Sequence, residues 1–183
     1  MPFTFPITSD SGSAIRTRRS TAGPCCKSAC CMYSVRWASV TPAWPCASTA
    51  TSTRHTTLIS GATELLEHVS RSYRLFVLSN GFHEVQSLKM ERAGIARYFR
   101  GLILSERVGA RKPNPVFFDY ALHHTRTRRT EVLMIGDSYA ADIAGALRSG
   151  IDALWYNPAG LPPPGDLSPQ FTVRTLDEIR EIL

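Results

Sequence analysis

The stretch Arg74–Gly81, RLFVLSNG, joins a continuous run of apolar residues to a polar turn. An unbroken apolar run of this length is typical of a strand buried on both faces of a parallel sheet. The Ser-Asn-Gly that follows is typical of a turn closing such a strand. Glu131–Ser138, EVLMIGDS, repeats the pattern later in the chain. The two stretches therefore predict strands of one open α/β fold.

The sequence around these stretches alternates between helical and strand patterns. Gly61–Ser70 places its two leucines and Val69 on one helical face, and Thr175 is suited to cap the helix that follows it. Further helices are expected at 82–93, 116–123, 140–148 and 176–183, and further strands at 102–104, 152–156 and 171–173. Residues 56–183 are therefore predicted to form a Rossmann-like α/β core, a parallel sheet with helices on both faces.

Residues 1–55 differ in chemistry from this core. Of the 15 acidic residues, only Asp10 lies in the first 60 positions, which also hold six basic residues. The net charge of these 60 residues is therefore +5, whereas that of the remainder is +1. Apart from a short strand expected at 3–8, no periodicity persists there. All five cysteines also lie in this third. Their odd number does not suit a disulfide framework, and adjacent pairs such as Cys25 and Cys26 do not have the spacing of a zinc site. This third is predicted to be irregular.

The composition excludes several broad classes of protein. A chain of 183 residues with 43% hydrophobic and 20% charged residues resembles one globular domain and not a disordered protein. No apolar run approaches the roughly 18 residues of a membrane span. The basic residues are not interleaved with aromatic ones as on a nucleic-acid-binding surface. We therefore expect a cytoplasmic protein without a membrane or nucleic-acid partner.

Two polar groups fall where open α/β sheets place their chemistry, at the carboxyl ends of the strands. Ser79, Asn80 and Gly81 offer a hydroxyl, a carboxamide and backbone N–H groups to an anion. Lys112 precedes a proline that stiffens the backbone, so it can present a fixed cation. Taken singly, each has an ordinary explanation as a common turn or a solvated lysine.

A pair of carboxylates forms the third group. Asp137 follows the strand predicted at 131–135, and Asp142 lies five residues further on, in the first turn of the next helix. Mg²⁺ is a hard cation that takes oxygen ligands of this kind and keeps waters that a phosphate can replace. The alternative is that Asp137 caps the helix and Asp142 interacts with its dipole.

In this order, Ser79, Lys112 and the Asp137/Asp142 pair resemble the second, third and fourth motifs of the haloacid dehalogenase superfamily. Shorter stretches resemble its pyrimidine 5'-nucleotidase branch, which acts on noncanonical nucleoside monophosphates. These stretches are Asn80–Gln86, Ser105–Gly109, Lys112–Pro115, Phe118–Leu122 and Trp155–Asn157. The resemblance covers about 56–183 and implies a Mg²⁺-dependent phosphomonoester hydrolase whose partner is a small phosphate ester, a nucleoside 5'-monophosphate.

The resemblance also assigns roles to these residues. In the superfamily an aspartate attacks phosphorus to form a phospho-aspartate, and a second aspartate two residues later protonates the leaving alcohol. Ser79, with Asn80 and its turn, would bind the transferring phosphoryl oxygens, and Lys112 would neutralise charge on phosphate and nucleophile. Asp137 would ligate Mg²⁺, and Asp142 would complete or orient the metal shell.

The first motif of the superfamily, an apolar strand followed by Asp-x-Asp-x-Thr, is absent from the sequence. The one acid before Glu64 is Asp10, which becomes the candidate nucleophile, but the general-acid position after it holds Gly12 and the threonine position Ala14. The helical cap that selects the substrate in the superfamily is not recognisable either. Because the first motif also supplies the central strand, its loss would leave unpaired N–H and C=O groups on both neighbouring strands.

We therefore expect little or no phosphatase activity from the chain as written. One hypothesis is that residues 1–55 derive from a shifted reading frame ahead of an ordinary nucleotidase, because the loss of acids ends where the resemblance begins. It predicts that another frame of the DNA upstream of the Thr56 codon encodes Asp-x-Asp-x-Thr. The alternatives are a noncatalytic relative that binds phosphate or Mg²⁺, and a phosphatase for another small phosphate ester such as a phosphosugar. The Asp137/Asp142 pair and Lys112 favour phosphoryl transfer over dehalogenation, because dehalogenation needs no metal.

Overall fold

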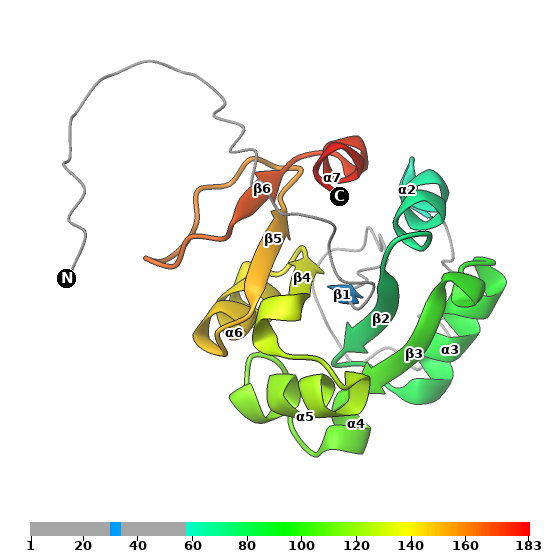
Figure 1. The fold of residues 1–183 in the computed structure, drawn as a ribbon, viewed down its shortest axis with the longest axis horizontal. Helices are drawn as coiled ribbons and strands as arrows, with labels where there is room; N and C mark the ends of the chain where they lie inside the picture. Colours follow the sequence, from blue (N-terminus) through cyan, green and yellow to red (C-terminus); the bar gives the residue numbers. More distant parts are fainter. Residues whose placement is uncertain (1–29, 34–57) are drawn as a thin grey trace, which may run out of the picture.

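The structure, a computed structural model, describes residues 30–33 and 58–183. Its six strands form one parallel sheet in the order β3-β2-β1-β4-β5-β6 (Figure 1). The strands are β1 (Cys30–Tyr33), β2 (Arg74–Ser79), β3 (Phe99–Leu104), β4 (Val132–Gly136), β5 (Asp152–Tyr156) and β6 (Phe171–Val173). The α-helices are α2 (Ala62–Val69), α3 (His83–Arg92), α4 (Ser105–Val108), α5 (Pro115–Thr125), α6 (Ala144–Arg148) and α7 (Leu176–Ile182). This arrangement confirms the predicted α/β fold.

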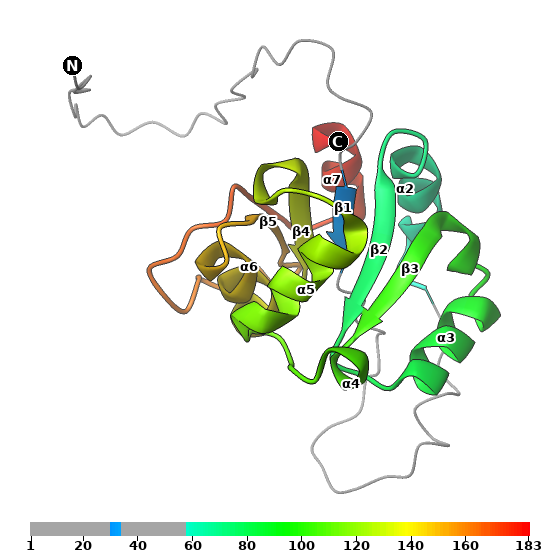
Figure 2. The same cartoon turned by 60° about the horizontal axis from the view of Figure 1, so that its bottom comes forward.

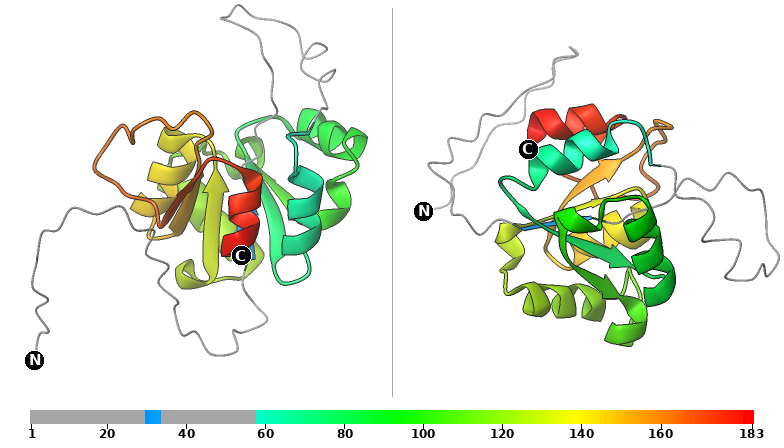
Figure 3. Two further views of the ribbon diagram at one scale, coloured as in Figure 1. Left: turned by 90° about the horizontal axis from the view of Figure 1, so that it is seen from above. Right: turned by 90° about the vertical axis from the view of Figure 1, so that its right-hand side faces the viewer.

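Helices cover both faces of the sheet, which explains the continuous apolar runs in β2 and β4. Leu75 and Val77 of β2 pack with residues of α2, α3 and α7, whereas Phe76 and Leu78 pack on the other face with residues of α5 and α6. Figure 2 shows α5 and α6 in front of the sheet and α7 and α2 behind it, and Figure 3 shows α2 beside α7. No helix in the described part of the chain is long and apolar enough to cross a bilayer.

The observed elements follow the order of the predicted ones, although β3 and α5 are longer than predicted. The predicted bounds of β2, β5 and β6 agree with the structure, and Thr175 caps α7 by accepting the Glu178 N–H at 3.3 Å. The short helix α4 was not predicted. The helix predicted at 140–148 begins with a π-helical turn, η3 (Tyr139–Ile143), in which Ile143 N–H donates to Ser138 C=O at 3.3 Å. Such turns are frequent at functional sites.

The centre of the sheet differs from the sequence-based expectation. The absence of the first motif led us to expect that the central strand would be missing, but β1 lies there and pairs in parallel with β2 and β4. Backbone hydrogen bonding needs no particular side chains, so a segment without a recognisable strand pattern can still fill the position. The strand predicted at 3–8 and the candidate nucleophile Asp10 lie outside the described residues.

Candidate functional site

The register of the central strands aligns the predicted site residues at one edge of the sheet. Tyr33 of β1 pairs with Val77 of β2 and with Ile135 of β4. Ser79 and Asp137 each lie two residues beyond these partners, on either side of β1. Parallel strands end at the same edge of a sheet, so the turn after β2 and the start of η3 flank the end of the central strand.

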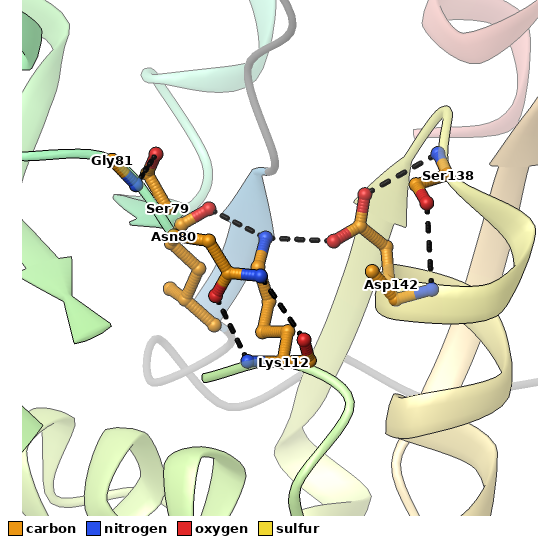
Figure 4. A network of polar contacts seen from close by, with 8 residues as sticks. Ser79, Asn80, Gly81, Lys112, Ser138 and Asp142 are labelled. Atoms are coloured by element: carbon orange, nitrogen blue, oxygen red, sulfur yellow. Dashed lines mark hydrogen bonds and ion pairs between the residues drawn. The ribbon is translucent and has the colours of Figure 1, made fainter. Parts of the chain in front are cut away.

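Lys112 lies between these two strand ends. Its side chain is 3% exposed, and its ammonium Nζ donates to Leu78 C=O at 2.7 Å and lies 2.6 Å from Asp142 Oδ1 (Figure 4). The Asp142 side chain is 2% exposed. The structure thus brings together Lys112, the end of β2 and Asp142, as the sequence predicted, and it joins the two charges in a buried ion pair.

Asp142 is held in place by the start of its own helical turn. Its Oδ2 accepts the Ser138 N–H at 3.3 Å. The residue at the end of β4 is Gly136, and a Cβ there would lie 2.6 Å from Asp142 Cβ and 2.7 Å from Oδ2. Real side chains do not approach so closely, so glycine is what allows the carboxylate to lie against the end of the strand.

Two opposing effects set the pKa of the buried Lys112 ammonium. Burial lowers the pKa of Lys112 below the ordinary lysine value, and the attraction of Asp142 and, more weakly, of Asp137 offsets only part of that effect. The ammonium is therefore a buried cation whose charge is offset by Asp142, its ion-pair partner at 2.6 Å.

Asn80 holds the backbone of Lys112 through both ends of its carboxamide. Its Nδ2 donates to Lys112 C=O at 3.0 Å, and its Oδ1 accepts the Lys112 N–H at 2.9 Å. Ser105, at the start of α4, donates its hydroxyl to Asn80 C=O at 3.2 Å. The carboxamide that was predicted to help bind phosphate is therefore directed at the lysine loop, and it fixes that loop to the end of β2.

Ser79 and Gly81 form a compact turn after β2. The Gly81 N–H donates to Ser79 Oγ at 3.0 Å, and Ser79 is 9% exposed. Because the oxygen accepts this bond, the hydroxyl proton can be directed to a phosphoryl oxygen at the strand end. Gly81 thus orients the serine hydroxyl through its backbone, and its own N–H is already engaged.

The described residues offer oxygen ligands for a divalent cation, but few of them. Asp137 is half-buried at the end of β4, and Asp142 Oδ1 has no hydrogen-bond partner in the described structure beyond its ion pair with Lys112. No group of three or more metal-ligating side chains occurs among residues 30–33 and 58–183. Mg²⁺ commonly uses one or two carboxylates and completes its shell with waters and substrate phosphate. The donor set therefore fits Mg²⁺, with Asp137 as the more accessible ligand.

An acid that could serve as nucleophile is absent from the sequence around β1. Tyr33 is followed by Ser34, Val35 and Arg36, and no Asp or Glu occurs between Asp10 and Glu64. The described site contains a buried ammonium, a serine hydroxyl and two aspartates. The sequence that continues the central strand adds no carboxylate to them.

A comparison with known sequence families identifies the family to which this fold belongs. The sequence family of haloacid dehalogenase-like hydrolases matches residues 43–156. The chain belongs to this family. The residues that resemble the second, third and fourth motifs of this family, Ser79, Lys112 and Asp137/Asp142, all lie within the matched range.

Relatives and solved structures extend this assignment. The chain is 36% identical to pyrimidine 5'-nucleotidase YjjG of Escherichia coli over 69% of its own length and 57% of the relative's, and 32% identical to pyrimidine 5'-nucleotidase PynA of Streptococcus pneumoniae over 68% and 54%. It superposes on the magnesium-bound crystal structure of the HAD-hydrolase YfnB from Bacillus subtilis with a TM-score of 0.67 and 29% identity, covering 70% of this chain and 57% of that one. The chain thus spans slightly more than half the length of these relatives.

Two contacts at the site were not predicted from the sequence. Ser138 donates its backbone N–H to Asp142, and the Trp155 indole Nε1–H donates to Asp137 C=O at 3.1 Å. A tryptophan at the end of a strand could have been singled out, because a buried indole N–H needs an acceptor. The residue that accepts from it depends on the pairing of β4 with β5, which the sequence does not give.

Proposed function

We propose that this site binds the phosphoryl group of a nucleoside 5'-monophosphate together with Mg²⁺. The observation that carries the proposal is the buried ammonium of Lys112, 2.6 Å from Asp142 and next to the turn at Ser79. A buried cation next to a serine hydroxyl and a strand-end carboxylate suits a dianionic phosphate and its counterion. The similarity to two pyrimidine 5'-nucleotidases supports the nucleotide as substrate class.

Each residue has a distinct part in binding. The Ser79 hydroxyl donates to a phosphoryl oxygen, and Lys112 neutralises negative charge on the phosphate. Asp142 holds the ammonium in place, and Asn80 holds the backbone of the same lysine. Asp137 is the residue that would hold Mg²⁺, which when bound neutralises further charge on the phosphoryl oxygens.

Catalysis also requires a nucleophile and a general acid, and the chain has no match for either beyond Asp10. Without a general acid, the alkoxide of the leaving nucleoside departs poorly. We therefore propose that the chain as written binds phosphate esters with little or no turnover. An active nucleotidase of this family would need an Asp-x-Asp-x-Thr segment at the end of its central strand.

The second candidate is a regulatory or interaction module that has lost the nucleophile motif and binds phosphate or Mg²⁺ without any catalytic role, in contrast to a nucleotidase whose first residues come from a shifted reading frame. The lack of acids between Asp10 and Glu64 is the observation that favours it. The observations leave a different small phosphate ester as the alternative ligand, since the substrate-selecting cap has no counterpart among the described residues.

Calorimetric titration of the purified full chain tests the proposal. We expect saturable binding of a pyrimidine nucleoside 5'-monophosphate in the presence of Mg²⁺, weaker binding of inorganic phosphate, and at least a tenfold loss of Mg²⁺ affinity in Asp137→Asn. Asp177→Asn, the same chemical change at an exposed residue of α7, should leave both affinities unchanged. Absence of nucleotide and phosphate binding, or equal effects of the two variants, would contradict the proposal.

A further inference from the structure

The peptide group that joins Asp137 to Ser138 is held at both ends. Its C=O accepts the Trp155 indole Nε1–H at 3.1 Å, and its N–H donates to Asp142 Oδ2 at 3.3 Å. Trp155 is only 5% exposed, so water has little access to compete for the indole bond. The orientation of this peptide is therefore set by one side chain from β5 and another from η3.

The position of Trp155 follows from the pairing of strands β4 and β5. Trp155 is the register partner of Gly136, the residue just before Asp137. The indole packs in the core on the α5/α6 face, and the Tyr139 ring meets it edge-on, with centroids 5.0 Å apart at 67°. The Tyr139 hydroxyl in turn donates to Leu167 C=O. The packing thus restricts the tilt of the indole ring.

The same contacts continue across the site. Asp142 accepts the Ser138 N–H through Oδ2 and pairs with Lys112 through Oδ1, and Lys112 donates to Leu78 C=O at the end of β2. A continuous series of polar contacts therefore runs from β5 through the end of β4 to β2. A rotation of the Asp137–Ser138 peptide would disturb both the carboxylate of Asp137 and the support of the lysine.

We propose that Trp155 is a positioning residue for the metal site: its indole N–H orients the Asp137 backbone so that the carboxylate faces a bound Mg²⁺. The inference rests on the proposed function, because it takes Asp137 as the metal ligand. Outer partners that orient a metal ligand commonly account for a 10- to 100-fold difference in metal affinity. A single hydrogen bond to the backbone of the ligand lies at the lower end of that range.

A role in packing alone makes a different prediction. Trp155→Phe keeps an aromatic ring in the core but removes the N–H donor, so a packing role would lower stability without a selective change in Mg²⁺ affinity. Tyr139→Phe is the matched control, because it keeps the ring against Trp155 and removes only the hydroxyl bonded to Leu167. Comparing the two variants separates the donor from the packing around it.

Mg²⁺ titration of the full-length chain by calorimetry, without nucleotide, is the test. We expect the Mg²⁺ dissociation constant to rise about tenfold in Trp155→Phe and to change less than twofold in Tyr139→Phe. Equal dissociation constants in wild type and Trp155→Phe would overturn the inference alone. No Mg²⁺ binding by the wild-type chain would overturn the proposed metal site and the inference together.

A second measurement applies if Trp155→Phe does not fold. The indole N–H resonance of Trp155 in the wild-type chain can be assigned by elimination with Trp37→Phe and Trp44→Phe. That proton is hydrogen-bonded to the backbone of Asp137, the proposed metal ligand. We therefore expect Mg²⁺ to shift its resonance until saturation, with the same dissociation constant that calorimetry gives. An unshifted resonance at saturating Mg²⁺ would overturn the inference.

Discussion

Replacing one member of the Lys112–Asp142 ion pair should destabilise the fold more than replacing both. The two side chains are 3% and 2% exposed and their charged atoms lie 2.6 Å apart, so neither charge is solvated. Removing one partner of a buried pair costs about 3–5 kcal/mol because the other charge is left uncompensated. We therefore expect Asp142→Asn and Lys112→Met each to lower the free energy of unfolding by about that amount.

The double variant isolates the interaction itself. Lys112→Met/Asp142→Asn contains no buried charge at this position, although Leu78 C=O loses its donor, at a cost of about 1–3 kcal/mol. The double variant should therefore lose only about 1–3 kcal/mol, less than either single variant, which against a summed loss of about 6–10 kcal/mol corresponds to a coupling of about 5–7 kcal/mol. Urea unfolding followed by circular dichroism measures all four proteins. Losses that add within about 0.5 kcal/mol would refute the reasoning, because additivity indicates independent sites.

Three further predictions concern the surroundings of this pair. Asn80→Ala should lower the free energy of unfolding by about 1–3 kcal/mol, since two hydrogen bonds to the Lys112 backbone are lost, and should weaken phosphate binding, measured by calorimetry. Gly136→Ala should cost about 1–3 kcal/mol, because its Cβ would collide with Asp142, whereas Gly101→Ala, whose Cβ would lie 3.4 Å from the nearest side chain, should cost less. Between the lowered pKa of Lys112 in the folded chain and its ordinary value of 10.5, the unfolded chain binds more protons at this residue than the folded chain. The free energy of unfolding of the wild type, relative to that of Lys112→Met, should therefore rise with pH through this window and level off above it. A difference between the two proteins that stays constant from about pH 7 to the ordinary lysine pKa of 10.5 would contradict this prediction.

Much of the fold could be predicted because its strands are buried on both faces. The interior positions of β2 and β5 are buried, so no polar residue interrupts their apolar runs, and the ends of both strands are sharp in the sequence. The central strand β1 could not be predicted. It spans four residues within a stretch lacking periodicity, and its place follows from the two neighbours with which it pairs.

The candidate site was predicted in outline but not in its contacts. The rule that strand ends meet at one edge was enough to expect Ser79, Lys112 and Asp142 near one another, and the structure places them so. Which atoms bond depends on side-chain directions that spacing does not determine. The Asn80 carboxamide bonds to the backbone of Lys112, and the Trp155 indole bonds to the backbone of Asp137. No pattern in the sequence predicts either contact.

The central claim is that the chain binds a nucleoside monophosphate without hydrolysing it. The most direct test measures phosphate release from a pyrimidine nucleoside 5'-monophosphate by the purified full chain at saturating Mg²⁺, together with binding of the same nucleotide. The account predicts binding without turnover above the uncatalysed rate, because the binding groups are present and the nucleophile motif is not. Mg²⁺-dependent turnover that disappears in Asp137→Ala would contradict it, and if that turnover survived Asp10→Ala, the nucleophile would have to be a residue other than Asp10.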